Sequence, residues 1–193
     1  MPIDRRVEAG DSPVGGECLI SVDIEASGPS PSTGSLIALG ACLVADPESA
    51  FYRELRPLPE RPWLAAAERI HGLTAARLAE QGTEPAAAMA AFADWLADVA
   101  DGARPIFVGF NAPFDWMFVA DYFHRFLGHN PFGVSALDLK SLFMGRDGVT
   151  AWSETRRDLV IARHPIRRAA THNALDDAQA QAELAQRLLE HSP

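Results

Sequence analysis

Short apolar runs and amphipathic stretches follow one another along the chain, and their order predicts an α/β fold. Apolar runs typical of strands cover residues 18–28, 35–45, 50–56, 105–110 and 134–139. Apolar residues at helical spacing cover residues 63–70, 84–100, 113–127, 139–144 and 173–190. Three strands in succession, followed by strands and helices in alternation, predict a mixed sheet with helices on both faces.

The connections between these elements contain residues that favour turns and helix ends. Residues 28–34 are rich in Gly, Pro and Ser, which predicts a loop after the first strand. His71-Gly72 is expected to end the helix over 63–70, and Thr74 can cap the next turn. Residues 145–171 have no clear period. We expect one domain over 18–193, preceded by a flexible tail over 1–17.

Composition is that of an ordinary globular protein, with 48% hydrophobic and 22% charged residues in 193. The longest apolar run, residues 36–45, is too short to cross a bilayer, and residues 1–17 lack the apolar segment of a secretory signal. Cys18 and Cys42 are interpreted as small buried residues on neighbouring strands, because two cysteines make no disulfide framework. These features predict a cytoplasmic protein that is not bound to a membrane.

The formal net charge of −9 argues against long-range capture of nucleic acid by a basic surface. It leaves room for a local site at which divalent cations reverse the sign of clustered acids. Residues 146–172 contain six arginines against three acids. This segment is a candidate phosphate-facing strip, although a solvated surface is the more common fate of any single arginine.

Two acids interrupt the first apolar run. Side chains alternate along a strand, so Asp23 and Glu25 are expected on one face and Val22 and Ile24 on the other. Two carboxylates about 4 Å apart repel by roughly 4 kcal/mol at an effective dielectric near 20. A hard divalent cation resolves such repulsion. The alternative is a strand whose acids meet arginines or water at the end of the sheet.

Further acids stand at predicted helix starts. Asp115 falls in the first turn of the helix that follows Pro113, and Asp177 lies about one turn into the helix that Asn173 can cap. His172 precedes that cap. Together with Asp23 and Glu25 these residues form four carboxylates and one imidazole. Such a set can hold two divalent ions around a phosphodiester, with the histidine taking a proton from water.

Three motifs in this order resemble the DEDD 3′–5′ exonucleases of the histidine-bearing subtype. They are Val22-Asp23-Ile24-Glu25, Asn111-Ala112-Pro113-Phe114-Asp115 and His172-Asn173-Ala174-Leu175-Asp176-Asp177. The segment Ile70-His71-Gly72-Leu73-Thr74 also resembles this family, so the likeness extends from about residue 18 to residue 189. The group includes polymerase proofreading subunits, ribonuclease T and oligoribonuclease.

The resemblance implies an RNase H-like fold with a five-stranded mixed sheet and a 3′–5′ exonuclease that releases nucleoside 5′-monophosphates from single-stranded RNA or DNA. It implies two Mg²⁺ or Mn²⁺ ions bound by Asp23, Glu25, Asp115 and Asp177. Asp23 would bridge them, Glu25 and Asp177 would share one, and Asp115 would hold the other partly through water. His172 would be the general base.

The same resemblance suggests residues for the substrate. Ser27 and Gly28 would lie against the terminal nucleotide, His71 would approach the 3′ end, and Asn111 belongs to the second motif. Phe114 would offer a stacking surface, although it could equally be a core residue.

Two positions depart from the pattern or leave it ambiguous. Pro29 stands where some relatives have an aromatic residue, and Asp176 beside Asp177 makes the last ligand ambiguous by one residue, with the spacing favouring Asp177. Two other functions stay open, namely hydrolysis of short oligonucleotides or dinucleotides and a non-catalytic nucleic-acid-binding module. No motif in the sequence distinguishes RNA from DNA as the substrate. Several relatives are homodimers, so a homodimer is a further possibility.

Overall fold

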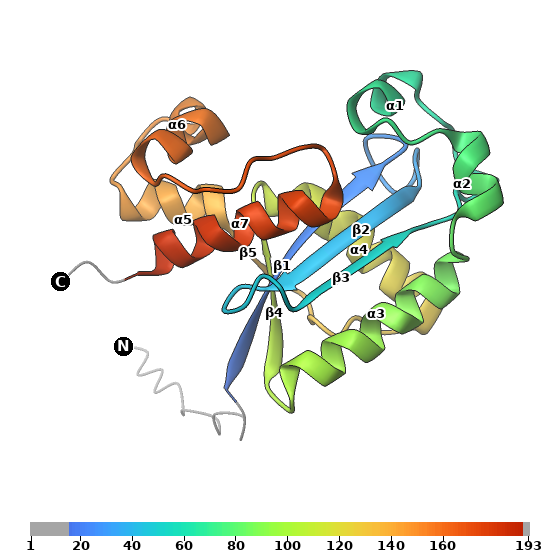
Figure 1. Ribbon diagram of the computed structural model, residues 1–193, viewed down its shortest axis with the longest axis horizontal. Coiled ribbons are helices and arrows are strands. Elements are labelled where there is room, and N and C mark those ends of the chain that lie inside the picture. Colours follow the sequence, from blue (N-terminus) through green and yellow to red (C-terminus); the bar gives the residue numbers. More distant parts are fainter. Residues whose placement is uncertain (1–15, 191–193) are drawn as a thin grey trace, which may run out of the picture.

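The computed structural model describes residues 16–190 (Figure 1). A single five-stranded sheet has the order β3-β2-β1-β4-β5. Its strands are β1 (Glu17–Ala26), β2 (Leu36–Leu43), β3 (Ala50–Glu54), β4 (Arg104–Gly109) and β5 (Ala136–Asp138). The pairs β1–β2 and β2–β3 are antiparallel, whereas β1–β4 and β4–β5 are parallel. The predicted mixed sheet is therefore confirmed, with β1 at its centre.

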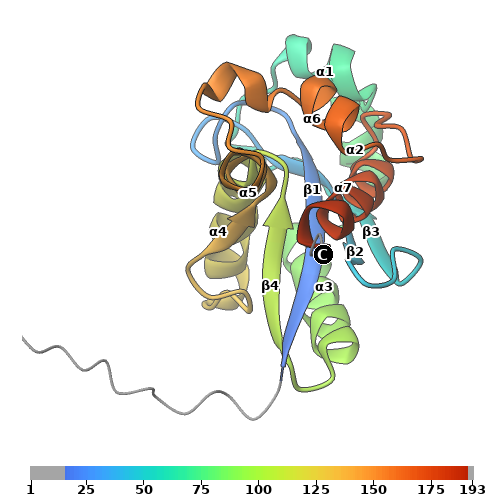
Figure 2. The same cartoon turned by 90° about the vertical axis from the view of Figure 1, so that its left-hand side faces the viewer.

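Within the described residues, helices cover both faces of this sheet (Figure 2). They are α1 (Ala65–His71), α2 (Ala75–Gln81), α3 (Pro85–Ala100), α4 (Ala112–Leu127), α5 (Leu139–Arg146), α6 (Arg157–Arg163) and α7 (Ala174–Leu189), with a 3₁₀ turn η1 (Trp152–Thr155). The helices predicted from apolar spacing all form. The segment 145–171, which had no clear period, contains η1 and α6.

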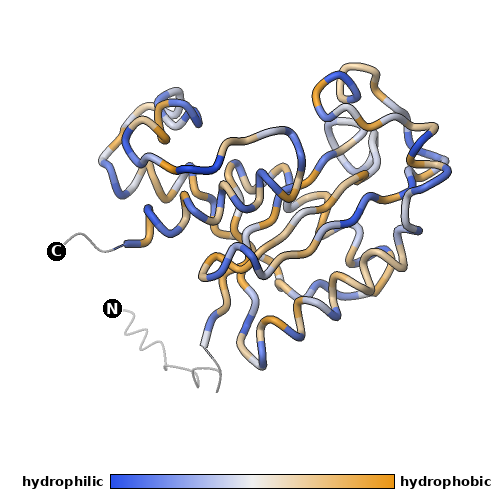
Figure 3. The backbone as a smooth tube through the Cα atoms, in the orientation of Figure 1, coloured by the Kyte–Doolittle hydropathy of each residue, from blue (hydrophilic) through white to orange (hydrophobic). Residues whose placement is uncertain are grey.

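Two apolar cores lie on opposite faces of the sheet. On one face Ile20, Val22 and Ile24 of β1 pack with aromatic residues of α3 and α4 such as Phe92 and Phe118. On the other face α7 packs with α5, α6 and residues of β2 and β4 such as Cys42 and Val108. Figure 3 shows the hydrophobic residues concentrated along the strands, while the connection from α6 to α7 is strongly hydrophilic. Even-numbered residues of β1 thus enter one core, which leaves Asp23 and Glu25 on the α7 face.

The element boundaries differ from the predicted ones by only a few residues. Leu36–Leu43 is shorter at both ends than the strand expected over 35–45, and α1 begins at Ala65 rather than at residue 63. Gly72 ends α1 in the left-handed conformation (φ 72°), and the Thr74 hydroxyl caps α2, as predicted. The predicted tail falls mainly on residues 1–15, outside the described residues, and Glu17, which we assigned to it, is the first residue of β1.

Candidate active site

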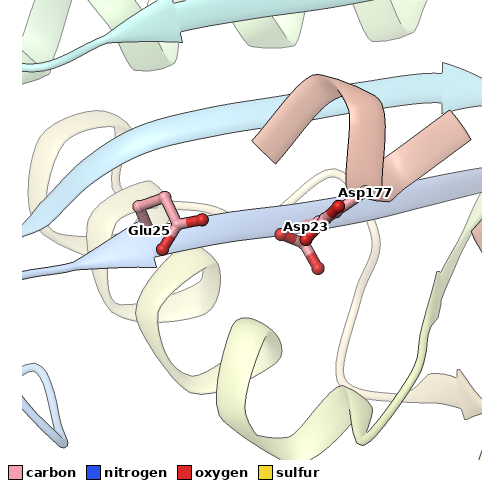
Figure 4. Close-up of side chains that lie close together, drawn as sticks. All are labelled: Asp23, Glu25 and Asp177. Atoms are coloured by element: carbon pink, nitrogen blue, oxygen red, sulfur yellow. The ribbon is translucent and has the colours of Figure 1, made fainter. Parts of the chain in front are cut away.

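Asp23, Glu25 and Asp177 converge on the α7 face of the sheet (Figure 4). One carboxylate oxygen of each lies within 4.8 Å of the others. The first two come from alternate positions of β1, and the third comes from the first turn of α7. The alternation expected from the sequence is therefore confirmed, and Asp177, rather than the exposed Asp176, is the α7 residue that joins the group.

Two side chains fix the start of α7, those of Asn173 and Asp177. The Asn173 side chain accepts hydrogen bonds from the backbone N–H groups of Leu175 and Asp176, which confirms the predicted N-cap. The Thr171 N–H donates to Asp177 Oδ1 at 2.8 Å. Asp177 is only 7% exposed. The approach to α7 thus orients this carboxylate toward β1.

Gly40 of β2 is what allows α7 to lie so close to the sheet. It pairs with Asp23 in the β1–β2 register. A Cβ at Gly40 would lie 2.3 Å from the carbonyl carbon and oxygen of Ala174, closer than real side chains ever approach. The absence of a side chain at this position therefore sets the distance between the first turn of α7 and the acids of β1.

Asp115 approaches the same strand from α4. It lies in the first turn after Pro113, is 5% exposed, and accepts a hydrogen bond of 3.1 Å from the Ile24 N–H. Asp138, at the end of β5, accepts a bond of 3.0 Å from the Ala112 N–H and thereby ties the start of α4 to the sheet. In the described chain, Asp115 is not one of the three acids that lie within 4.8 Å of one another. Its hydrogen bond to the N–H of Ile24, the residue between Asp23 and Glu25, places it beside them.

Burial and the neighbouring carboxylates raise the pKa values of Asp23, Glu25 and Asp115. Burial, followed by the charges of Asp115, Asp177 and Glu25, raises the pKa of Asp23 well above its usual range. Burial and the charges of Asp177 and Asp115 raise the pKa of Glu25 to about 8. Burial raises the pKa of Asp115 to about 7, against the opposing effect of the Ile24 hydrogen bond. Without a cation, ionising these carboxylates at neutral pH is therefore unfavourable.

Gln181 is a residue of this site that the sequence did not indicate. It is fully buried on α7, one turn beyond Asp177. Its Nε2 donates to Asp23 Oδ1 at 2.7 Å, and its Oε1 accepts a short hydrogen bond from the Phe110 N–H. It thus holds Asp23 against the end of β4. A glutamine on an amphipathic helix has no distinguishing spacing, so only its complete burial marks it.

His172 directly precedes the cap of α7. Its side chain is exposed, and its backbone is in the left-handed conformation with φ 61°, which non-glycine residues seldom adopt. Such strain is typical of sites where surrounding structure imposes the conformation. The structure places the imidazole at the entry to α7, next to the turn that holds Asp177. Its role as general base stays a prediction.

The predicted substrate residues lie around the carboxyl end of β1. Ser27 is buried, its hydroxyl donates to the Pro62 carbonyl at 3.2 Å, and its carbonyl accepts from the Leu64 N–H at 3.0 Å. These bonds tie the segment before α1 to the end of β1 (Figure 1). At Gly28 a Cβ would lie 2.4 Å from the Thr33 carbonyl oxygen, so the loop can close only with glycine there.

The other predicted substrate residues are on α1 and at the start of α4. His71 is half-buried at the end of α1 and lies edge-on to Trp63. Asn111 is exposed in the left-handed conformation (φ 66°) before α4. Phe114 is half-buried and packs on Phe118, with part of its surface free. Their contacts with substrate stay predictions.

Most arginines of the segment 146–172 form internal contacts. Arg156 pairs with Asp158, Arg163 approaches Asp147 and Glu154 at 3.9 Å, and Arg168 pairs with Glu48. These residues fit a solvated surface better than a phosphate-facing strip. Arg157 forms none of these pairs.

The donor set fits hard divalent cations. The group contains only carboxylate oxygens, the ligands that Mg²⁺ and Mn²⁺ prefer. The alternative, acids neutralised by arginine, does not fit, because no salt bridge within the described residues involves any of the four acids. The raised pKa values of Asp23, Glu25 and Asp115 show that these buried carboxylates lack a neutralising positive charge in the part of the chain that the structure describes.

A five-stranded mixed sheet of this order, with acids near the end of its central strand, is an RNase H-like fold. The RNase_T family model, described as Exonuclease, matches residues 20–185, and the chain belongs to this family. It is a metal-dependent 3′–5′ exonuclease of the DEDD group.

Comparisons with individual proteins agree with this assignment. The chain is 40% identical over 169 residues to the 3′-5′ DNA exonuclease Cap18 of Escherichia coli, covering 87% of this chain and 89% of that one. It superimposes on the nuclease domain of 3'hExo, a DEDDh family member bound to rAMP, with a TM-score of 0.71 at 15% identity, covering 93% and 94% of the two chains. For E. coli Exonuclease I in complex with a dT13 oligonucleotide the TM-score is 0.67 at 17% identity, with 88% of this chain and 40% of that one covered. None of the helices over residues 16–190 is long and apolar enough to span a membrane.

Proposed function

We propose that this exonuclease removes nucleoside 5′-monophosphates from the 3′ end of single-stranded DNA with two Mg²⁺ or Mn²⁺ ions. The observation that supports the ion site best is the convergence of Asp23, Glu25 and Asp177 within 4.8 Å, with Asp115 beside them. Asp23, Glu25 and Asp177 would hold one ion, and Asp23 and Asp115 would hold the other. When bound, such ions activate a water for attack and neutralise charge on the phosphate.

The protein's own groups prepare this centre. Gln181 orients Asp23 through its Nε2–H, and the Ile24 N–H orients Asp115, so both carboxylates are fixed before ligands arrive. His172, exposed at the entry to α7, is the proposed general base. A neutral imidazole can accept a proton from water.

His71 is the best-supported contact for the 3′ end. The Leu73 N–H donates to His71 Nδ1 at 3.0 Å, so the proton of the neutral ring is on Nε2. Burial lowers the pKa of His71, which favours this neutral form. Nε2 is buried and has no hydrogen-bond partner in the described chain, so it is available to donate to a substrate oxygen.

The bound nucleotide would lie among the remaining predicted residues. The turn at Ser27 and Gly28 would pass along the terminal sugar, Asn111 would line the start of α4, and the free surface of Phe114 would stack on a base. DNA is proposed as the substrate because the relative at 40% identity is named a DNA exonuclease.

A second candidate substrate is a short oligonucleotide or dinucleotide. The net charge of −9 and the internal pairing of most arginines in 146–172 favour it, since an extended basic groove is not needed for a substrate of a few nucleotides. A cytoplasmic location and a homodimer stay predictions.

The test is digestion of 5′-labelled single-stranded DNA, RNA and a dinucleotide with Mg²⁺ or Mn²⁺. We expect stepwise shortening of the DNA from its 3′ end, and no products with Asp23→Asn. The matched control is Asp94→Asn, which changes an exposed acid of α3 and should leave the ladder unchanged. Faster cleavage of RNA would contradict the DNA preference, and cleavage of the dinucleotide alone would favour the second candidate.

A further inference from the structure

Arg157 is linked to the acidic centre through Phe110 and Gln181, although it lies outside the three motifs. It is the first residue of α6. Its guanidinium carbon lies 5.8 Å from the centre of the Phe110 ring. Phe110 in turn donates its N–H to Gln181, which holds Asp23. Phe110 therefore contacts the guanidinium with its ring, and its backbone N–H bonds Gln181, the residue that bonds Asp23.

The guanidinium of Arg157 is not neutralised by a carboxylate. No ion pair within 4.0 Å is formed between Arg157 and an acid of the described chain. The cation therefore lies against the ring of Phe110, directly after β4, without being bound to any of the four carboxylates.

The donors of Arg157 are also unused. Its Nε and Nη2 are buried and have no hydrogen-bond partner within residues 16–190. Buried donors without partners are costly, and the preceding arginine avoids this cost, because Arg156 donates two bonds to Asp158. Nε and Nη2 form one edge of the guanidinium, the edge that binds two oxygens of a phosphate in parallel.

A group of this kind would serve the proposed reaction. The four carboxylates repel a phosphodiester, and the charge of any cation that they bind is partly neutralised by the carboxylates themselves. A fixed guanidinium attracts the phosphate without competing for the acids, because it makes no ion pair with them. Its lack of a side-chain partner is then explained by a partner that comes with the substrate.

We propose that Arg157 binds the phosphate of the 3′-terminal nucleotide, through Nε and Nη2, beside Asp23. This inference rests on the proposed function, since it assumes a nucleotide at the acidic centre. Arg157 is then a substrate-binding residue that also retains the released nucleoside 5′-monophosphate.

The test compares Arg157→Gln and Arg157→Lys with wild type in the binding of deoxyadenosine 5′-monophosphate and of deoxyadenosine, each titrated in the presence of Mn²⁺. Loss of a charge-assisted pair of hydrogen bonds should weaken the binding of the monophosphate by about 10- to 100-fold. The affinity for the nucleoside should be unchanged. Arg157→Lys should be intermediate, because an ammonium keeps the charge but not the two parallel donors. Arg156→Gln, one residue earlier and paired with Asp158, is the matched control and should bind as wild type.

The outcomes separate this inference from the proposed function. Wild-type affinity of Arg157→Gln for the monophosphate would overturn the role of Arg157 alone. Equal weakening for the nucleoside would also overturn it, since the effect would then be structural. If the variant loses the monophosphate while wild type binds no Mn²⁺ in a separate titration, the phosphate role holds and the ion centre is contradicted. If Arg157→Gln does not fold, Arg157→Lys is used instead. The proposal then requires that its affinity for the monophosphate falls while its affinity for the nucleoside does not.

Discussion

The amide of Gln181 donates to Asp23 Oδ1 at 2.7 Å, and this bond links α7 directly to the central strand. The orientation of the amide is determined by its other partner: the Phe110 N–H needs an acceptor, so Oε1 faces β4 and the NH₂ group faces the carboxylate. One buried side chain therefore joins β1, β4 and α7 at the point where the acids converge. Asp23 is oriented by the fold and not only by its ligands.

Replacing Gln181 by Met should reduce turnover by about 10- to 100-fold, as is typical when a residue that orients a metal ligand is lost. The free energy of unfolding should fall by roughly 1–3 kcal/mol, because the Phe110 N–H loses its acceptor. Gln179→Met is the matched control on the same helix, since Gln179 donates to the Pro47 carbonyl away from the acids. Rate assays and urea unfolding check both effects; equal turnover losses in the two variants would contradict a specific role of Gln181.

Gly40→Ala should displace the first turn of α7, since its Cβ would overlap the backbone of Ala174. We expect a loss of about 1–3 kcal/mol in the free energy of unfolding and roughly a 100-fold fall in turnover, because Asp177 moves relative to Asp23. Gly145→Ala in α5, where a Cβ meets no atom within 4 Å, is the control and should be stabilising by up to about 1 kcal/mol. A fully active Gly40→Ala protein would show that the close approach is not needed.

The metal-free protein should lose stability as the pH rises. The pKa values of Asp23, Glu25 and Asp115 are raised in the folded state, so the folded protein binds more protons than the unfolded one. Their contribution is fully present below about pH 4, the pKa of unfolded carboxyls, and is lost as the pH rises toward about 8, the pKa of Glu25. Urea unfolding in EDTA at several pH values measures this. Asp23→Asn should flatten the slope and be as stable as wild type or more stable at pH 8, whereas an unfolded Asp23→Asn protein would make Asp23 a structural residue.

His172→Ala should reduce turnover by about 10²- to 10⁴-fold while Mn²⁺ binding is retained. Because φ is 61° at this position, alanine also adds backbone strain there. His172→Asn serves as the second variant, since asparagine tolerates the left-handed conformation but cannot act as a base of suitable pKa. Both variants should be equally slow if the imidazole matters. Normal turnover in His172→Asn would instead assign the effect to the backbone.

The acids were predictable because they follow simple local rules. Alternation along β1 placed Asp23 and Glu25 on one face, and helix-start signals at Pro113 and Asn173 placed Asp115 and Asp177 in first turns. The supporting residues were not predictable for physical reasons. Gln181 and Gly40 act through contacts between elements distant in sequence, and neither differs locally from any other helix glutamine or strand glycine.

The arginines show the limit of reading charge from sequence. Six arginines in 146–172 suggested a basic strip, but whether each is paired depends on acids elsewhere, such as Glu48 for Arg168. Arg157 is distinguished only by what it lacks, a partner for its buried nitrogens among the described residues. Such a property emerges only when the irregular segment before α7 is folded against the sheet.

Calorimetric titration of Mn²⁺ into wild type, Asp23→Asn and Asp94→Asn tests the central claim most directly, namely that the acids converge in order to bind the ions used in cleavage. The account predicts saturable binding to wild type and to Asp94→Asn, and its loss in Asp23→Asn. Binding that is equally strong in Asp23→Asn, or no binding to wild type, would contradict it.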